Sequence, residues 1–322
     1  MVSIKDVAEA CGVSPMTVTR AFKKDSVIAE KTRNRILKVA NELGYIPSIL
    51  PSVLLNSRTN AIGVIIPSLE NYTYIEFLRK IEEKVSAYGY YTLVRFVTPR
   101  EEEYVSALEM MGSNRVSAIV MLNMPEYCKD IVEKLNVNIP VIVLSHYSAR
   151  GVARIEFDDQ KGIYNATQHL LSNGHRKIAY FGYGPSAKEN IKGYYTALAE
   201  HGIVPCEDII STEWIEDDEC FLEKITKEKP TAVIGIARQG EKCLSALYRG
   251  GFRIPQDISF LAYDDSSLAR TLGIDVISHP MDDFANLIME FINNNVSAEQ
   301  RIATNYKLDV ILTKRHSVKK IL

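Results

Sequence analysis

The chain has 322 residues, of which 46% are hydrophobic, and its formal net charge at pH 7 is −2. A chain of this length and composition can bury a large core and exceeds what one small domain needs. No apolar run approaches the ~18 to 20 residues that a membrane span requires, and no apolar leader precedes the first predicted helix. These features exclude a membrane-spanning protein, and we expect a cytoplasmic location.

The first 22 residues predict two short helices joined by a tight turn. Ile4, Val7 and Ala8 share one apolar face of the first helix. Gly12 tolerates the positive φ that the turn needs, and the Ser-Pro pair at 14 and 15 starts the second helix. This pattern is typical of a helix-turn-helix, and the alternative is an ordinary helical hairpin within an enzyme.

A third helix is predicted just beyond this pair. Ile36, Val39 and Ala40 recur at helical spacing, Gly44 caps the C terminus, and Pro47 ends the element. Three helices make a minimal folding unit, so we expect a helix-turn-helix domain over residues 1–47.

Positive charge is concentrated in this N-terminal part of the chain. Residues 1–58 carry nine Lys and Arg against five Asp and Glu, a surplus of four, whereas the rest carries 29 against 35, a deficit of six. The negative total therefore does not argue against binding to phosphate. We expect Arg20 to contact guanine, and Lys23 and Lys24 to contact phosphate. The other expected DNA contacts in this domain are Ser14, Pro15, Met16, Thr17, Thr19, Thr32 and Tyr45.

From residue 61 onward, short apolar runs alternate with amphipathic stretches. The runs AIGVII, YYTLVRFV, VSAIVML, IPVIVL, KIAYFG, TAVIGIA and ISFLAY indicate strands that are covered on both faces. Helices are predicted between them over 74–87, 101–111, 160–171 and 193–201. A break in rhythm near 156–160 indicates two similar subdomains with a ligand cleft between them. The predicted fold class is α/β, with parallel sheets in a two-lobed body.

Several segments, taken together, resemble the lactose-repressor (LacI) family of bacterial transcription regulators, in order along nearly the whole chain. They are IKDVAEACGVSPMTVTRAF, EKTRNRILKVANELGYIP, AIGVIIPSLEN, HLLSNGHRKIAYFG and PQDISFLAYDDSSLA. The stretch 47–71 is most similar to the gluconate- and idonate-operon regulators. The resemblance implies a periplasmic-binding-protein-like body over 59–322, in which the chain crosses between the lobes near Phe157, Ile277 and Leu308.

Residues 48–58 are unusually apolar for a linker, since a solvated spacer would be rich in Gly, Ser and charge. The resemblance marks this segment as a hinge helix, in which Leu54 would enter the minor groove of DNA and kink the duplex. The alternative is that its apolar residues pack on the body. Pro51 and Ser52 depart from the family's usual Ala-Arg and place a proline in a very short helix.

The resemblance also implies a small-molecule site between the lobes. The matching positions are Asn71, Tyr74, Asp264 and His279. Polar and aromatic side chains suit a sugar-like ligand, because its hydroxyl groups need hydrogen-bond partners and its ring faces need apolar contact. The alternative for Asp264 is a helix cap or loop carboxylate.

This predicted site departs from the family pattern at two places. Asn190 stands where many relatives carry an arginine, and 236–238 replace a usual Asn-Asp pair. Two cations near these positions, Lys188 and Arg238, would suit an acidic ligand such as a sugar acid or phosphate.

Motifs of catalysis and metal binding are absent from the sequence. There is no GxSxG, Walker, GxGxxG or HExxH pattern, and the six histidines lack ligand spacing. Asp158 and Asp159 are neighbours whose side chains would diverge, and the resemblance makes His175 structural. The cysteines, Cys11, Cys128, Cys206, Cys220 and Cys243, are scattered and suit a reducing compartment. We therefore expect no enzyme, no metal and no cofactor.

The sequence predicts a homodimeric, sequence-specific DNA-binding regulator, a repressor of carbohydrate or sugar-acid genes. Its expected partners are a pseudo-palindromic operator and an effector that is gluconate-like or a sugar phosphate. A periplasmic sugar-binding protein would lack residues 1–58, and an α/β enzyme with an accessory DNA-binding domain would show a nucleophile or cofactor motif. The alternative within the family is a regulator with a remodelled pocket that responds to a protein partner or a non-sugar metabolite.

Overall fold

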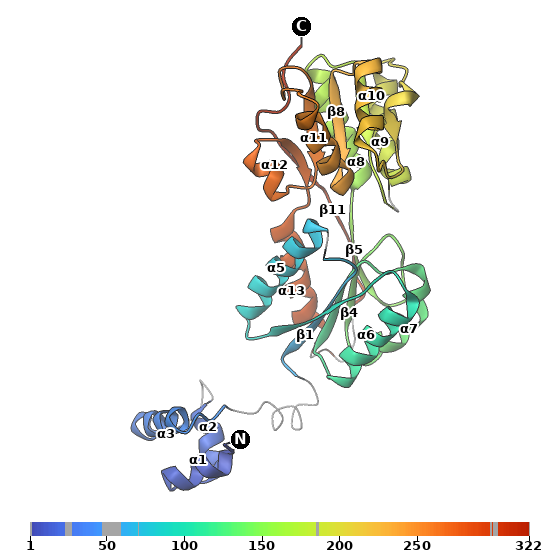
Figure 1. The fold of residues 1–322 in the computed structure, drawn as a ribbon. Coiled ribbons are helices and arrows are strands. Elements are labelled where there is room, and N and C mark those ends of the chain that lie inside the picture. The colour runs from blue at the N-terminus through green and yellow to red at the C-terminus, as the bar shows by residue number, and fades with distance from the viewer. Residues whose placement is uncertain are drawn as a thin grey trace. The chain divides into compact units, whose positions relative to one another are not determined.

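The computed structural model describes residues 2–22, 28–46, 59–69, 71–184, 187–296, 298 and 302–321. The chain divides into two compact units, Met1–Thr59 and Asn60–Leu322 (Figure 1). The segments that contain Lys23, Lys24, Pro51, Ser52 and Leu54 lie outside the described residues.

The described part of the first unit forms α1 (Ile4–Cys11), α2 (Pro15–Ala21) and α3 (Glu30–Glu42). Gly12 has a φ of 62° in the turn between α1 and α2, where L side chains are disfavoured. Ser14 caps α2, since its hydroxyl accepts the Thr17 N–H at 3.2 Å. The apolar faces of the helices close one small core around Val7, Val18 and Ile36.

Arginines of α3 hold the two preceding helices in place. Arg33 Nε donates to the Ala21 carbonyl at the C terminus of α2, at 3.0 Å. Arg35 donates to the Cys11 carbonyl at the C terminus of α1. A cation at a helix C terminus satisfies carbonyls that lack a partner within the helix and opposes the helix dipole. These two arginines are therefore structural.

The first sheet of the second unit has the strand order β11-β5-β4-β3-β1-β2 and runs parallel. Its strands are β1 (Ala61–Ile66), β2 (Tyr91–Phe96), β3 (Ala118–Leu122), β4 (Val141–Leu144), β5 (Ala153–Phe157) and β11 (Asn305–Leu308). Helices α5 (Tyr72–Ser86) and α13 (Met281–Asn295) pack on one face. Helices α6 (Glu101–Ser113) and α7 (Lys129–Asn136), with the short η1 (Glu126–Cys128), pack on the other. We call these elements the first lobe.

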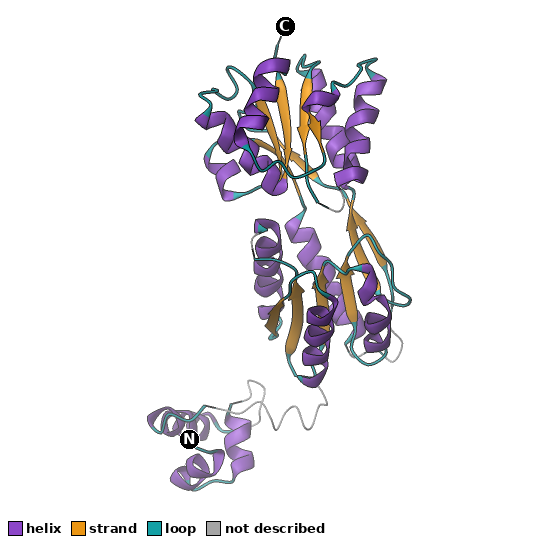
Figure 2. Ribbon diagram, turned by 45° about the vertical axis from the view of Figure 1, so that its right-hand side comes forward, coloured by secondary structure: helices purple, strands orange, loops and turns teal. Residues whose placement is uncertain are grey.

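The second sheet has the order β12-β10-β9-β8-β6-β7, parallel except for the antiparallel β12. Its strands are β6 (Ile178–Phe181), β7 (Ile210–Ser211), β8 (Ala232–Ile236), β9 (Ser259–Tyr263), β10 (Asp275–Ser278) and β12 (Ile311–Thr313). One face is covered by α8 (Asp159–Ser172) and α9 (Ala187–Glu200), and the other by η2 (Glu207–Ile209), α10 (Asp218–Glu228), α11 (Ala237–Arg249) and α12 (Ser267–Thr271). Figure 2 shows the helices on both faces of each sheet. We call these elements the second lobe.

The α/β class, with a helix-turn-helix domain and a two-lobed body of parallel sheets, is confirmed. The chain passes between the lobes after Phe157, again between Ser278 and Met281, and again between Leu308 and Ile311. The helix predicted to begin at residue 193 begins earlier, at Ala187. Gly193 therefore lies inside this helix. The position is occupied by glycine because a Cβ there would clash with the Gln160 carbonyl oxygen of α8.

The C-terminal segment is bound firmly to the second lobe. Asp275 is 3% exposed and accepts the backbone N–H groups of Arg315 at 3.0 Å and Ser317 at 3.1 Å. His175 is fully buried, and its ring nitrogens lie 2.9 Å from Thr231 Oγ1 and 3.0 Å from the Lys319 carbonyl oxygen. These bonds give His175 a structural position far from the surface. Within the described ranges, no helix is both long enough and apolar enough to cross a membrane.

The close approach of β8 and α11 sets the position of the α11 N terminus. A Cβ on Gly240 would lie 2.5 Å from the carbonyl carbon and oxygen of Gly235, so Gly240→Ala must push α11 off the sheet. We expect this change to lower the free energy of unfolding by about 1–3 kcal/mol, measured by urea denaturation of the full chain.

The matched control is Gly112→Ala in α6, where the nearest heavy atom to the new Cβ is Leu135 Cδ2 at 3.8 Å. Alanine favours a helix over glycine by about 0.5–1 kcal/mol, so this variant should be neutral or more stable. Equal losses in the two variants would contradict the close-approach argument.

Candidate functional site

The exposed face of the first unit is formed mainly by α2. Pro15, Met16 and Arg20 are exposed, and Met16 is 62% exposed. Thr19 Oγ1 donates to the Pro15 carbonyl at 3.1 Å. Thr17 Oγ1 lies 2.9 Å from Ser14 Oγ, so the hydroxyls of this turn stabilise the helix start.

Two more of the predicted DNA contacts lie on and after α3. Thr32 is half-buried in its first turn, and Tyr45 packs edge-on against Phe22 with ring centroids 5.9 Å apart. The ring of Tyr45 thereby links α3 to the end of α2. The predicted contacts by Lys23, Lys24 and Leu54 stay predictions.

A cavity of about 380 Å³ lies between the lobes of the second unit. This volume falls in the range of small-molecule sites. The first lobe lines it with Asn71, Tyr74, Phe77, Asn123 and Phe157. The second lobe adds Asp159, Asn190, Arg238, Tyr263 and Asp264, and His279 comes from the crossing between β10 and α13. The cavity is placed where the carboxyl ends of parallel strands meet, as expected for open α/β sheets.

Three residues at strand ends in this cavity have left-handed backbone conformations. Asn123 follows β3 with a φ of 107°, Ala237 follows β8 with a φ of 50°, and Asp264 follows β9 with a φ of 81°. Such conformations are disfavoured for residues other than glycine and persist where the surrounding structure enforces them, often at ligand sites. The backbone is therefore held in a shape that turns these segments toward the cavity.

One wall of the cavity holds a cluster of two carboxylates and an imidazole, which we call the His279 cluster: Asp159, His279 and Asp264. The Nε2 of His279 lies 3.5 Å from Asp159 Oδ1, and its Nδ1 lies 3.3 Å from Asp264 Oδ1. The side chains are only 12% exposed for His279 and 15% for each aspartate. Tyr263 donates its hydroxyl to Asp159 Oδ1 at 2.5 Å.

Protonation of His279 follows from these contacts. Burial alone would lower its pKa, but the two carboxylates outweigh burial and raise the pKa to about 9. A neutral imidazole donates from only one nitrogen and would present a lone pair to the other carboxylate. Burial by itself would raise the pKa of Asp159. The contacts with His279 and Tyr263 lower this pKa by more than burial raises it, so its net shift is downward. At neutral pH the cluster contains an imidazolium.

The tyrosines beside this cluster stay neutral and can donate hydrogen bonds. Burial, with the nearby Asp264, raises the pKa of Tyr74 to about 12. Burial and the Asp159 carboxylate raise the pKa of Tyr263 well above its usual value. The wall thus offers both acceptors and donors to a polar ligand.

A second part of the cavity lining is cationic and aromatic. Arg238 lies at the start of α11, where the N-cap residue, Ile236, has no side chain that could accept from the first N–H groups. Its guanidinium lies 5.8 Å from the ring centroid of Trp214, and Lys242 Nζ lies 5.6 Å from the same ring. Tyr183, which lines the cavity, packs edge-on against Trp214 at 5.5 Å. An anionic group is favoured here by the arginine and by the helix dipole.

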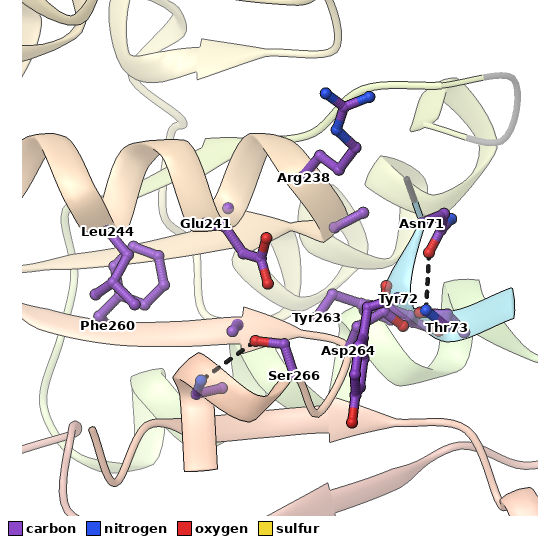
Figure 3. A pocket seen from close by; sticks show the side chains of 14 residues that line it. Asn71, Tyr72, Thr73, Arg238, Glu241, Leu244, Phe260, Tyr263, Asp264 and Ser266 are labelled. Atoms are coloured by element: carbon purple, nitrogen blue, oxygen red, sulfur yellow. Dashed lines mark hydrogen bonds between the residues drawn. The ribbon is translucent and has the colours of Figure 1, made fainter. Parts of the chain in front are cut away.

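A smaller pocket of about 30 Å³ adjoins this side (Figure 3). Figure 3 shows Asn71 and Thr73 at the start of α5 across from Arg238 and Glu241 of α11, with Asp264 below them. Asn71 is engaged as a helix cap, since its Oδ1 accepts the Thr73 N–H at 3.0 Å. Both lobes therefore present a helix N terminus to the same region.

Of the predicted effector contacts, Asn71, Tyr74, Asn190, Arg238, Asp264 and His279 line the cavity. Lys188 does not: it is exposed on α9, on the side away from the buried Asn190. Asp264 is not a helix cap, because Ser266 caps α12 by accepting the Ala269 N–H at 3.2 Å. Its carboxylate is instead part of the cavity wall.

The sequence does not single out Asp159, Tyr263 or Trp214. Asp159 follows Asp158 directly, and the sequence predicts only that the side chains of these two neighbours point in different directions. Asp158 caps α8 through the Lys161 N–H at 3.2 Å, while Asp159 faces the cavity. The available signals are the position just after a strand for Asp159 and the position at the end of a strand for Tyr263. For Trp214 the signal is that it is the single tryptophan of the chain. Within the described part of the chain, no three His, Cys, Asp or Glu side chains are arranged to hold a metal ion.

Comparison with known proteins gives matches over both units. The model of bacterial regulatory proteins of the lacI family matches residues 3–48. The model of periplasmic binding proteins and sugar binding domain of the LacI family matches residues 59–289. The HTH-type transcriptional repressor PurR of Glaesserella parasuis serovar 5 (strain SH0165) is 32% identical over 285 residues, which cover 84% of this chain and 82% of that protein.

Two further proteins are similar over nearly the whole chain. The HTH-type transcriptional repressor PurR of Vibrio vulnificus (strain CMCP6) is 28% identical over 343 residues, with 100% of both chains covered. The crystal structure of the lac repressor dimer bound to operator and the anti-inducer ONPF has a TM-score of 0.79 at 25% identity, with 99% of both chains covered. The named relatives are transcriptional repressors and not enzymes.

The raised pKa of His279 makes stability depend on pH. Because the pKa is about 9 in the folded chain and 6.5 in the unfolded chain, the stabilisation is complete below pH 6.5, declines as pH rises toward 9, and is absent above that. We expect a loss of about 3 kcal/mol over this interval, measured by urea denaturation at a series of pH values. His279→Gln should be less stable at pH 6.5 and should lack this slope; a slope unchanged in the variant would contradict the assignment.

Proposed function

The chain belongs to the LacI family of bacterial regulatory proteins, and from this premise we propose that it is a homodimeric repressor of carbohydrate or sugar-acid genes, acting on a pseudo-palindromic operator in the cytoplasm. The observation that carries the proposal is that one chain contains both an exposed face on α2, which we propose contacts DNA, and a body with a polar cavity between its lobes. One such face makes few phosphate contacts, whereas two related by a dimer axis double them and read two half-sites. The lac repressor structure, a dimer on operator, supports this arrangement.

Within the first unit, Arg20 is the proposed reader of base sequence. It is exposed on α2, whereas Arg33 bonds a helix carbonyl and is structural. Bidentate contact of arginine with guanine O6 and N7 is worth about 1–3 kcal/mol of discrimination. Pro15 and Met16 offer only apolar contact, which suits a thymine methyl group or groove shape.

We expect Arg20→Ala to lose preference at one base pair in each half-site. The measurement is selection of bound sequences from a randomised DNA pool by the full chain, followed by affinity measurements on single-base variants of the selected site. The loss should be about 1–3 kcal/mol per half-site at the guanine position. Arg33→Ala is the control and should reduce stability and affinity for all sequences alike. A uniform loss for Arg20→Ala would contradict the assigned role.

We propose that the effector is a polyhydroxylated acid, gluconate-like or phosphorylated. The carboxylates of the His279 cluster accept hydrogen bonds from hydroxyl groups but repel an anion. Arg238 and the uncapped start of α11 favour an anion on the other side. The acid group is therefore placed beside Arg238 and the hydroxyl groups toward His279.

Effector binding changes operator affinity if the ligand contacts one arrangement of the lobes better than another. Both lobes line the cavity, so a bound ligand makes such differential contacts. A coupling of about 1–3 kcal/mol changes affinity by ~5 to 150-fold, which is sufficient for induction. The second candidate, a regulator that responds to a protein partner or a non-sugar metabolite, is favoured by the replaced pocket residues at 190 and 236–238.

A thermal-shift panel tests the effector class. We expect D-gluconate or 6-phosphogluconate to raise the melting temperature of the full chain more than D-glucose does, because a ligand that binds only the folded state stabilises it. Arg238→Gln should weaken binding of the acids by ~10 to 100-fold, as expected for loss of a charge-assisted hydrogen bond. Lys188→Gln, which removes an exposed cation outside the cavity lining, is the matched control.

Stabilisation by neutral sugars or purines alone would reject the acidic effector. If no sugar, sugar acid, sugar phosphate or purine raises the melting temperature, the second candidate is favoured. The same ligands are then added to a complex of the chain with its selected operator, where release of DNA marks an inducer and tighter binding marks a corepressor.

A further inference from the structure

His279 occupies a special place in the chain, because it lies in the crossing between β10 of the second lobe and α13 of the first. Its ring packs on Phe157 with centroids 4.3 Å apart and on Phe77 with centroids 5.6 Å apart, both from the first lobe. Tyr263 of the second lobe contacts the same ring at 5.6 Å. The imidazole is therefore fixed by aromatic rings from both lobes.

The two carboxylates face this imidazole through one oxygen each. Asp159 presents Oδ1 to Nε2, and Asp264 presents Oδ1 to Nδ1. Among the described residues, the Oδ2 atom of each aspartate makes no hydrogen bond, and both side chains line the cavity. Each carboxylate thus has one oxygen held by His279 and one oxygen left for a ligand.

We propose that His279 is a positioning residue of the effector site: it holds Asp159 and Asp264 by their Oδ1 atoms, so that their Oδ2 atoms accept two hydroxyl groups of one polyhydroxylated ligand. This inference rests on the proposed function, because it specifies how the same cavity recognises its effector. It assigns to His279, which lines the same cavity, the placing of the two carboxylates that receive hydroxyl groups. Without the imidazole between them, neither Oδ1 atom has this cationic partner to fix the orientation of its carboxylate.

The imidazole contacts both carboxylates as ion pairs, at 3.5 Å for Asp159 and 3.3 Å for Asp264. The Oδ1 of Asp264 and the Nδ1 of His279 are buried, and among the described residues neither atom has a hydrogen-bond partner. A ligand hydroxyl that donates to Asp264 Oδ2 adds a partner to a carboxylate that has few among the described residues. A buried polar group with incomplete hydrogen bonding is stabilised strongly by such a partner.

The charged groups around His279 identify it as the one that titrates in the tested pH range. Burial raises the pKa of Tyr74 to about 12 and that of Tyr263 well above its usual value, so both stay neutral up to pH 10. The further groups that share a small pocket with His279 are Glu76 of α5 and Asp265 and Arg270 of the second lobe. Arg270 pairs with Asp265 at 3.1 Å, and Glu76 pairs with Arg79 at 3.0 Å. His146 and Glu156 lie 3.8 Å apart elsewhere in the cavity lining.

The test is isothermal titration of the full chain with D-gluconate and D-glucose, each compared with its monodeoxy analogues, from pH 7 to pH 10. In the wild-type chain, affinity should fall at least ~10-fold as pH rises through about 9, and deoxygenation at two ring or chain positions should weaken binding ~10-fold or more. His279→Gln should weaken binding at pH 7 by ~10 to 100-fold and should abolish the pH dependence above pH 8. His201→Gln, which changes an exposed histidine outside the cavity lining, should match the wild type.

The possible outcomes separate this inference from the proposed function. If a sugar or sugar acid binds, and His279→Gln retains both the affinity and the pH profile of the wild type, the positioning role is wrong while the proposed function stands. If His279→Gln only lowers the melting temperature and leaves the affinity of the folded protein unchanged, His279 is purely structural and the inference fails. If neither compound nor any other polyhydroxylated member of the panel binds at pH 7, the effector class is wrong and the inference falls with it.

Discussion

Strands that are apolar on both faces leave only their ends for polar chemistry, and this constraint organises the body of the protein. β1, β3, β8 and β9 are buried along their whole length between layers of helices. Because the strands of each sheet run parallel, except for β12, their carboxyl ends lie at one edge, and the polar residues that follow them gather there. The interlobe cavity is the consequence, and the left-handed residues at the ends of β3, β8 and β9 show that the backbone itself is adapted to it.

This constraint also explains which features are predictable from the sequence. Continuous apolar runs identify the strands, and their alternation with amphipathic stretches predicts the α/β class. The start of α9 is not predictable in this way, because Gly193 reads as a helix breaker until its contact with the Gln160 carbonyl of α8 is known. Asp264 is visible as a polar residue after a strand, whereas Asp159 is hidden beside the capping Asp158 and is distinguished only by the direction of its side chain.

Arginines illustrate the same limit in the first unit. Composition shows a surplus of positive charge in residues 1–58, but it does not show which groups these charged side chains contact. Arg33 and Arg35 bond the last carbonyls of α2 and α1, so part of this charge stabilises the domain itself. Arg20 lies on the exposed side of α2. Only a structure separates the arginines that bond helix carbonyls from an arginine that is exposed on α2.

The cavity lining contains charged groups of both signs. The His279 cluster combines an imidazolium with two carboxylates, while Arg238 lies at the start of α11 in the second lobe. A ligand with hydroxyl groups at one end and an acid at the other has one favourable orientation in this field. Because His279 also lies in a crossing between the lobes and packs on rings from both, the wall that we propose to bind hydroxyl groups is part of the connection between the lobes. One side chain, His279, therefore belongs both to the carboxylate cluster and to this connection.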